Sequence, residues 1–292
     1  MNDEIKGMAL GVVGVAIFSI TLPATRIAVS GLEPVIVGLG RAVVAAGLAA
    51  LTLAITRQPL PTPAQLKRLV VTALGVVLGF PLFSAIAMLY VPAVHGGIVL
   101  GVLPLATTAA GAVFCGEKPS PKFWAVALLG SALVVAFAMI RGAGALQAAD
   151  LWLLAAAVSA GAGYAVGGEL SRTMGGWQVI CWALIVSLPF IVPPVLWYLP
   201  DVDWRAPLPV WGAFLYVAVF SQFLGFFAWN RGLAMGGVAR VGQVQLLQLF
   251  LTLLASAVLL GEVIDAVTIG FAVAVVGTVA ISRRMPVARR DV

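Results

Sequence analysis

Three glutamines in one apolar segment are the side chains best suited to bind a polar ligand. Gln243, Gln245 and Gln248 lie within a mostly apolar stretch near the end of the sequence. In a helix, Gln245 and Gln248 share a face, and Gln248 lies about 16 Å from the helix start. An amide has two donors and an acceptor, so it can bind both the carboxylate and the ammonium of a zwitterion. Alternatively, these amides only bond neighbouring helices.

A second group of candidate residues lies around the start of another apolar segment. His95 is the only histidine, and Tyr90 lies just before it. The imidazole could bond a carboxylate or respond to pH, and Tyr90 could line the same opening, but both could equally be interfacial residues. Deeper in that segment, Pro104 removes a backbone donor and predicts a kink, which frees carbonyls for neighbours, water or ligand.

Arg41 is the charged residue placed deepest in an apolar segment, about 12 Å from the segment start. A charge at that depth is costly and indicates a functional site, so Arg41 could bind a ligand carboxylate or anchor a helix C-terminus. Tyr164 and Trp229 lie in two further segments and could stack on an aromatic ligand. The complete predicted binding set is Arg41, Tyr90, His95, Pro104, Tyr164, Trp229, Gln243, Gln245 and Gln248.

Residues for catalysis or metal binding are scarce. The sequence has two cysteines, Cys115 and Cys181, and one histidine, which argues against a zinc site or a disulfide framework. It contains no G-x-S-x-G, H-E-x-x-H or G-x-x-x-x-G-K sequence, and a serine nucleophile would have one histidine as its base. We therefore expect no enzymatic activity and no cofactor.

Long apolar helices must position the candidate residues. The 292 residues are 62% hydrophobic and 10% charged, whereas soluble domains have about 25% charged residues. A spanning helix needs about 20 apolar residues, so the composition predicts an all-α, multi-pass protein of the lipid bilayer. The predicted spans are residues 7–29, 33–56, 68–90, 93–114, 121–140, 150–171, 176–199, 208–233, 237–260 and 265–283.

Basic residues predict the orientation of these spans. With the N-terminus in the cytoplasm, most lysines and arginines fall in inner segments, and only Arg141 and Arg205 fall in outer loops. Both termini are then cytoplasmic. The net charge of +6 thus reflects topology, and we expect no nucleic-acid partner and a protein that works as a monomer.

The two halves of the sequence repeat each other. Residues 96–117 and 236–262 each begin with Gly-Gly, continue as a long apolar segment and end with Gly-Glu. Five spans per half is an odd number, so the second half must lie upside down relative to the first, as in many secondary transporters. We predict two repeats, residues 1–147 and 148–292, around a central cavity.

Short motifs resemble a known repeat. Residues 16–26 (AIFSITLPATR), Glu33-Pro34 and Gly40-Arg41 resemble the start of an EamA repeat, as do residues 87–90 with Leu103-Pro104. The resemblance covers about residues 7–283 and implies the drug/metabolite transporter superfamily, with ten helices in two inverted repeats. It is greatest to exporters of aromatic amino acids in a bacterial inner membrane. The sequence departs from the family pattern at Leu249, where a proline is expected.

The resulting expectation is a secondary transporter that exports amino acids, aromatic ones in particular, and related small metabolites. Every acidic residue except Glu169 lies at a predicted span end or in a loop, and Glu169 is about one turn from an end. The lack of a deep carboxylate predicts facilitated diffusion by alternating access. The alternative is export of another metabolite or an amphipathic drug, including proton-coupled export. A channel or scaffold is less favoured, because no continuous polar stripe is present.

Overall fold

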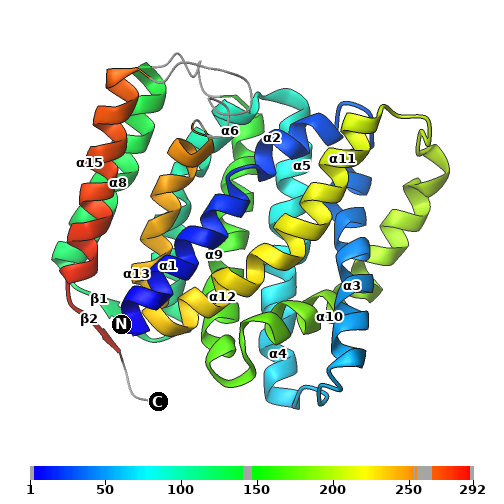
Figure 1. The fold of residues 1–292 in the computed structure, drawn as a ribbon, viewed down its shortest axis with the longest axis horizontal. Coiled ribbons are helices and arrows are strands. Elements are labelled where there is room, and N and C mark those ends of the chain that lie inside the picture. The colour runs from blue at the N-terminus through cyan, green and yellow to red at the C-terminus, as the bar shows by residue number, and fades with distance from the viewer. Residues whose placement is uncertain (1–2, 141–146, 253, 255–264, 290–292) are drawn as a thin grey trace.

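Apolar helices form almost all of the computed structural model, which describes residues 3–140, 147–252, 254 and 265–289 (Figure 1). The first half has α1 (Asp3–Phe18), α2 (Thr21–Ala28), α3 (Arg41–Ile55), α4 (Pro63–Thr72), α5 (Phe80–Tyr90), α6 (Ala93–Val99), α7 (Leu103–Phe114) and α8 (Pro121–Ile140). The second half has α9 (Ala149–Met174), α10 (Gly176–Tyr198), α11 (Leu208–Tyr216), α12 (Gly225–Gly236), α13 (Val238–Gly242) and α15 (Ala266–Arg284).

Eight helical stretches of the described residues are long and apolar enough to cross a membrane. They are Asp3–Ala28, Ile36–Ile55, Pro63–Tyr90, His95–Phe114, Ala149–Met174, Gly176–Asp201, Leu208–Gly236 and Ala266–Arg284. These match the predicted spans one to four, six to eight and ten, while α8 occupies the predicted fifth span with a shorter apolar stretch. The predicted ninth span lies partly outside the described residues, as does the second Gly-Glu motif, so the ten-span inverted arrangement remains a prediction.

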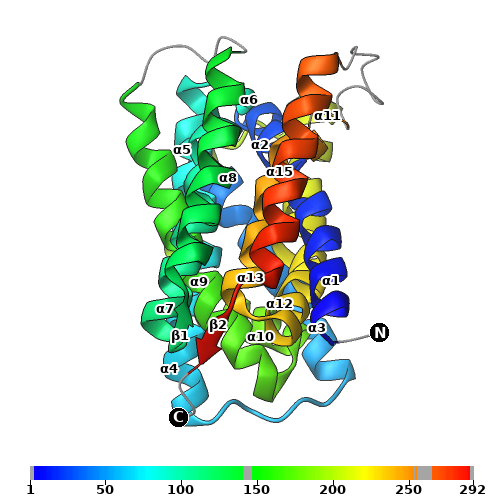
Figure 2. The same ribbon diagram turned by 90° about the vertical axis from the view of Figure 1, so that its left-hand side faces the viewer.

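Two short strands identify one end of the bundle. β1 (Glu117–Pro119) pairs antiparallel with β2 (Val287–Arg289), and Glu117 lies opposite Arg289. α1 begins and α15 ends near these strands, whereas α2, α6 and α11 lie toward the other end (Figure 2). We call these the strand end and the opposite end. The first described helix therefore begins on the same side of the bundle on which the last one ends.

Glycines bring the two halves of the chain into close contact. α1 packs along α12 (Figure 1), and Gly7 and Gly11 of α1 approach Gly232 of α12. A Cβ on Gly7 would lie 2.6 Å from the Gly236 nitrogen, so a larger residue would push the helices apart. Small residues allow this backbone approach, because association within lipid depends on close packing rather than on a hydrophobic drive.

Several spans are interrupted near their middle. The first span breaks at Ser19 and Ile20, because Pro23 has no N–H to donate to the Ser19 carbonyl. The fourth span contains the 3₁₀ segment η3 (Leu100–Val102) just before Pro104, so a helix interruption lies where the proline predicts a kink. The ninth segment contains the 3₁₀ segment η6 (Gln243–Leu247), although Leu249 replaces the family proline. Membranes tolerate such breaks where neighbouring groups satisfy the freed backbone.

Three further interruptions are π-helical and share one region. They are η1 (Ile36–Gly40) in the second span, η2 (Ala73–Gly79) in the third and η5 (Val217–Leu224) in the eighth. A π-helical turn shifts the direction of the side chains that follow it and often occurs at a functional site. No pattern in the sequence predicted these segments.

Candidate substrate-binding site

The break in the first span leaves three successive carbonyls outside the regular helix, and each accepts a hydrogen bond from the second half of the chain. These bonds run from Tyr216 Oη to the Ile17 oxygen (2.8 Å), from Gln248 Nε2 to the Phe18 oxygen (3.4 Å) and from Thr252 Oγ1 to the Ser19 oxygen (2.6 Å). The contacts satisfy the backbone that the proline disrupts. They also connect the broken helix directly to the eighth and ninth segments.

Two small cavities lie beside this break, and Gln248 lines both of them. Cavity A has the polar lining Thr21, Arg41, Tyr164, Ser221, Gln222 and Gln248 and the aromatic lining Phe18, Phe80 and Phe226. Cavity B is lined by Ser19, Pro23, Ala93, Gly97, Gln245, Gln248 and Thr252, among others. Each has a volume of about 20 Å³, which is room for about one water molecule. The centre of the bundle is therefore closed in this conformation.

Arg41 is the single charged side chain among the described residues that line either cavity. It begins α3 directly after η1 and is 2% exposed. Within the described part of the chain, its Nε has no hydrogen-bond partner and no carboxylate forms an ion pair with it. A buried cation without a partner is strongly unfavourable, so Arg41 is suited to hold an anion that enters the cavity.

The three π-helical segments meet at cavity A. η1 precedes Arg41, η2 contributes Val76 to the lining, and η5 contributes Ser221 and Gln222. Gln222 Nε2 donates to the Val76 oxygen at 3.0 Å, and the hydroxyls of Thr21 and Ser221 are 2.8 Å apart. Backbone irregularity and buried polar groups thus occur together around Arg41, as expected of a binding site rather than a purely structural core.

An aromatic cluster covers one side of cavity A. Ring centroids lie 5.2 Å apart for Phe18 and Phe226, 6.0 Å for Tyr164 and Phe226, and 5.3 Å for Tyr164 and Trp229. Tyr164 lines the cavity, and its contact with a ligand stays a prediction. Trp229 is fully buried against Phe18 and Tyr164 and lines neither cavity in this conformation. Its direct contact with ligand stays a prediction, and here it supports those two rings.

The sequence left two roles open for the three glutamines, ligand binding and hydrogen bonding to neighbouring helices, and the structure shows examples of both positions. Gln248 lines both cavities, and Gln245 lines cavity B. Gln245 Nε2 donates to Thr107 Oγ1 at 3.2 Å, while its buried Oε1 has no partner among the described residues. Gln243 lines neither cavity and donates to Thr108 Oγ1 at 3.0 Å. Gln243 therefore bonds a neighbouring helix, whereas the other two are available to a ligand.

The remaining predicted residues line neither cavity. His95 Nε2 is 2.6 Å from Asp150 Oδ1, and this buried pair joins α6 to α9. Tyr90 is 66% exposed and lines neither cavity, so its predicted place in a shared opening with His95 stays a prediction. Pro104 also lines neither cavity, and its carbonyl accepts a hydrogen bond from Thr108 Oγ1 at 2.8 Å.

Sequence reasoning missed several polar residues of the site. Thr21, Ser221 and Gln222 line cavity A, and Thr252 lines cavity B. The adjacent pair Ser221-Gln222 inside an apolar span was a usable signal, and so was Pro23 in the middle of the first span. The threonines gave no signal, because a threonine can satisfy its hydroxyl within its own helix.

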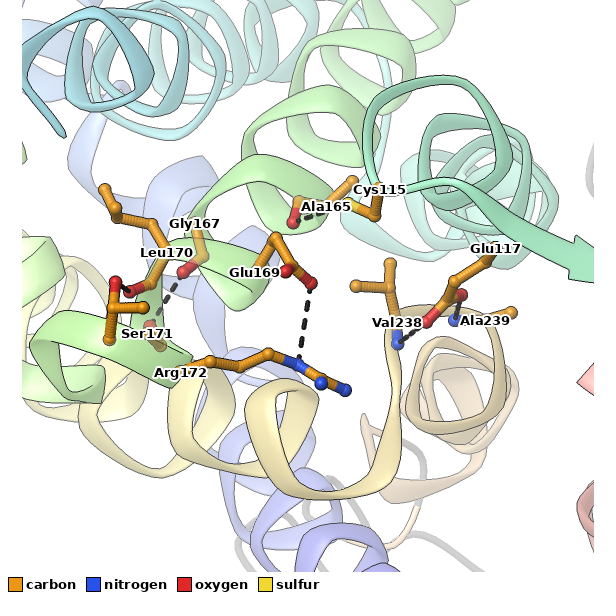
Figure 3. A network of polar contacts seen from close by, with 11 residues as sticks. Cys115, Glu117, Ala165, Gly167, Glu169, Leu170, Ser171, Arg172, Val238 and Ala239 are labelled. Atoms are coloured by element: carbon orange, nitrogen blue, oxygen red, sulfur yellow. Dashed lines mark hydrogen bonds and ion pairs between the residues drawn. The ribbon is translucent and has the colours of Figure 1, made fainter. Parts of the chain in front are cut away.

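The strand end is held together by a separate polar network (Figure 3). Glu117 Oε1 accepts from the Val238 amide at 2.9 Å, and Oε2 accepts from the Ala239 amide at 2.8 Å. The carboxylate thereby caps the start of α13, where free amides and the helix dipole favour a negative charge. Nearby, Arg172 Nε lies 3.5 Å from Glu169 Oε2. Arg172 and Glu117 both line a pocket of about 230 Å³ at this end.

Comparison with known proteins identifies the family. The EamA-like transporter family model matches residues 5–139 and again residues 147–283. "Uncharacterized transporter YdeK" of Bacillus subtilis is 45% identical over 285 residues, covering 97% of this chain and 99% of its own. A "Probable terminal-alkyne amino-acid exporter" of Streptantibioticus cattleyicolor is 27% identical over 207 residues, covering 69% and 68%. Neither name mentions aromatic amino acids.

One solved structure supports the fold. It is titled only as the crystal structure of a protein, and it aligns with a TM-score of 0.74 at 18% identity, covering 95% of this chain and 98% of its own. At that identity the likeness concerns the fold alone. The family that matches both halves of the chain is named as a transporter family, and the 45% identical relative is named as a transporter. The chain therefore belongs to the EamA-like transporter family and is a multi-pass membrane transporter, not an enzyme.

Proposed function

We propose that the chain exports amino acids, aromatic ones in particular, and related small metabolites across the bacterial inner membrane. The observation that carries this proposal is the pair of neighbouring cavities that share Gln248, with Arg41 and an aromatic cluster around one of them. A cationic donor, amides and aromatic rings match the carboxylate, the ammonium and the side chain of such a substrate. The Streptantibioticus relative, named as a probable amino-acid exporter, supports the substrate class.

The proposed architecture is two inverted five-span repeats, residues 1–147 and 148–292, with both termini in the cytoplasm. The two separate family matches, each over about half of the chain, support the division into repeats. The strand end would face the cytoplasm, because β1, β2 and the end of α15 lie there and carry several lysines and arginines. The repeats would then rock around the central cavities to expose them alternately to each side.

Facilitated diffusion is the proposed energetic mechanism. None of the described residues lining cavity A or B is acidic, so the pathway at the centre lacks a carboxylate that could carry a proton. Proton-coupled export is the alternative, and one specific observation favours it. The buried pair of His95 and Asp150 places an imidazole against a carboxylate on α6 and α9, near the opposite end of the bundle.

Counterflow in proteoliposomes tests the proposal. Vesicles containing the purified protein are loaded with unlabelled L-phenylalanine and diluted into labelled L-phenylalanine. We expect transient accumulation of label, competition by tyrosine and tryptophan, and the same rate after an ionophore collapses the pH gradient. Asp150→Asn should leave the rate within about twofold of wild type, a barrier change well below 1 kcal/mol.

Different failures would have different meanings. Absence of counterflow with every aromatic amino acid, together with counterflow of another metabolite or drug, would replace the proposed substrate. Loss of downhill transport on collapse of the pH gradient, or on the Asp150→Asn substitution with the protein still folded, would replace facilitated diffusion with proton coupling.

A further inference from the structure

We propose that cavities A and B are the two halves of one zwitterion site, in which Arg41 binds the carboxylate and Gln245 the ammonium of the same substrate. This inference rests on the proposed function and specifies how its site selects cargo. It assigns separate roles to two residues that the sequence placed in one undivided set of candidates.

The first observation is the unmatched donor in cavity A. Arg41 is 2% exposed, its Nε has no hydrogen-bond partner in the described part of the chain, and the described residues around the cavity include no carboxylate. The neighbouring polar groups, Gln222 and Ser221, are already bonded to Val76 and Thr21. Arg41 is therefore the group in this cavity with the strongest need for an anionic partner.

The second observation is the unmatched acceptor at cavity B. Gln245 is 6% exposed, and its Nε2 is bound to Thr107. That contact leaves Oε1 without a partner in the described part of the chain. A buried carbonyl oxygen of this kind is unfavourable unless a donor reaches it, and an ammonium has three donors and no acceptor. Cavity B also borders the broken helix at Ser19, whose carbonyl oxygen is a further acceptor.

The third observation is that one side chain separates the two halves. Gln248 lines both cavities, and within the described part of the chain its side chain makes one long bond, of 3.4 Å from Nε2 to the Phe18 oxygen. Rotation of this amide would join the cavities. The carboxylate and ammonium of an α-amino acid are attached to one carbon, and Gln248 is the residue that the two cavities share. A substrate bound at Gln248 would therefore direct one charge into each cavity. Its side chain would then face Phe18, Phe80 and Phe226.

This arrangement predicts selection for the complete zwitterion. L-phenylalanine has both charges, phenethylamine lacks the carboxylate, and 3-phenylpropionate lacks the ammonium. Each missing charge would leave Arg41 or Gln245 buried without a partner, which lowers affinity by about tenfold to a hundredfold. Apolar contacts with the aromatic cluster would be similar for all three compounds.

The test measures ligand affinity of the purified full-length protein in detergent, from the rise in melting temperature with each of the three compounds. We expect wild type to bind L-phenylalanine at least about tenfold more tightly than either analogue. Arg41→Gln should abolish the preference for L-phenylalanine over phenethylamine. Gln245→Leu should abolish the preference over 3-phenylpropionate and leave the preference over phenethylamine in place. Gln243→Leu is the matched control and should change neither.

Several outcomes would overturn the inference. Equal affinity of wild type for L-phenylalanine and phenethylamine would remove the role of Arg41, while the proposed export of amino acids could still stand. If both variants lose the same affinity for all three compounds, and their melting temperatures without ligand are unaltered, the substitutions affect the cavity in general. The separate roles of Arg41 and Gln245 would then be wrong. If Arg41→Gln does not fold, Arg41→Lys replaces it and should retain selection for the carboxylate. No binding of any amino acid to wild type would instead refute the proposed function itself.

Discussion

Arg41 and Gln248 show how depth and surroundings decide the role of a polar residue in a membrane. Both lie where their sequence positions place them, well inside an apolar segment, and both line the central cavities. Gln243 lies five residues before Gln248 but bonds Thr108, which is 135 residues away in the sequence. The position of a glutamine could therefore be predicted, whereas its partner depends on packing between distant helices.

A pair of matched substitutions separates these roles. Gln248→Leu should slow L-phenylalanine counterflow by at least about tenfold, a change of about 1.4 kcal/mol in the barrier, because it removes the amide shared by the cavities. Gln243→Leu should leave the rate within about twofold but lower stability by about 1 kcal/mol, because it removes a buried hydrogen bond. Melting temperature and counterflow are measured on both proteins. Equal effects of the two substitutions on transport would contradict the distinction.

His95 illustrates the limit of prediction at the residue scale. The sequence indicates a titratable group near a helix start but cannot show that Asp150 is its partner, because the pair depends on the packing of α6 against α9. The exposure of Tyr90 was equally unpredictable. An aromatic residue at a helix end can face lipid or a cavity, and the rotation of the helix decides between them.

At the scale of elements, the broken first span connects the two halves at the centre. Its carbonyls at Ile17, Phe18 and Ser19 accept bonds from Tyr216, Gln248 and Thr252. Proline accounts for the break, and this signal was present in the sequence although sequence reasoning did not use it. The π-helical segments gave no such signal, because they follow from competition between backbone bonds and side-chain packing.

Restoring the missing donor in the first span is expected to impair transport without loss of stability. Pro23→Ala supplies an N–H for the Ser19 carbonyl and favours a continuous helix across the break. We expect an unchanged or higher melting temperature and counterflow slowed by at least about tenfold, because the bonds to the second half must rearrange when the cavities open. Wild-type transport by a folded Pro23→Ala protein would show that the break has no role in opening.

At the scale of the whole molecule, apolar length predicted most of the spans correctly. Eight predicted spans correspond to helices of sufficient length within the described residues, since a long apolar run has few alternatives to a spanning helix. The close contact of α1 with α12 was not predicted. It depends on glycines that lie more than 200 residues apart, at positions where sequence alone shows no pairing.

The closed centre separates two regions that the proposed alternating access would open in turn. Ala93 lines cavity B on α6, toward the opposite end, and Met235 lines the pocket of about 230 Å³ at the strand end. Glu117 caps α13 beside that pocket and would stabilise the closed strand end. In an alternating carrier, substrate shifts the balance between the two openings, whereas a channel opens both together.

Cysteine accessibility measures this balance directly. In a protein with the buried Cys115 and Cys181 replaced by alanine, single cysteines at Ala93 and Met235 are labelled with a membrane-impermeant thiol reagent. The labelling is done in proteoliposomes with and without L-phenylalanine. The account predicts that substrate raises the labelling rate at one position and lowers it at the other. A parallel rise at both positions, or no response at either, would contradict transport by alternating access.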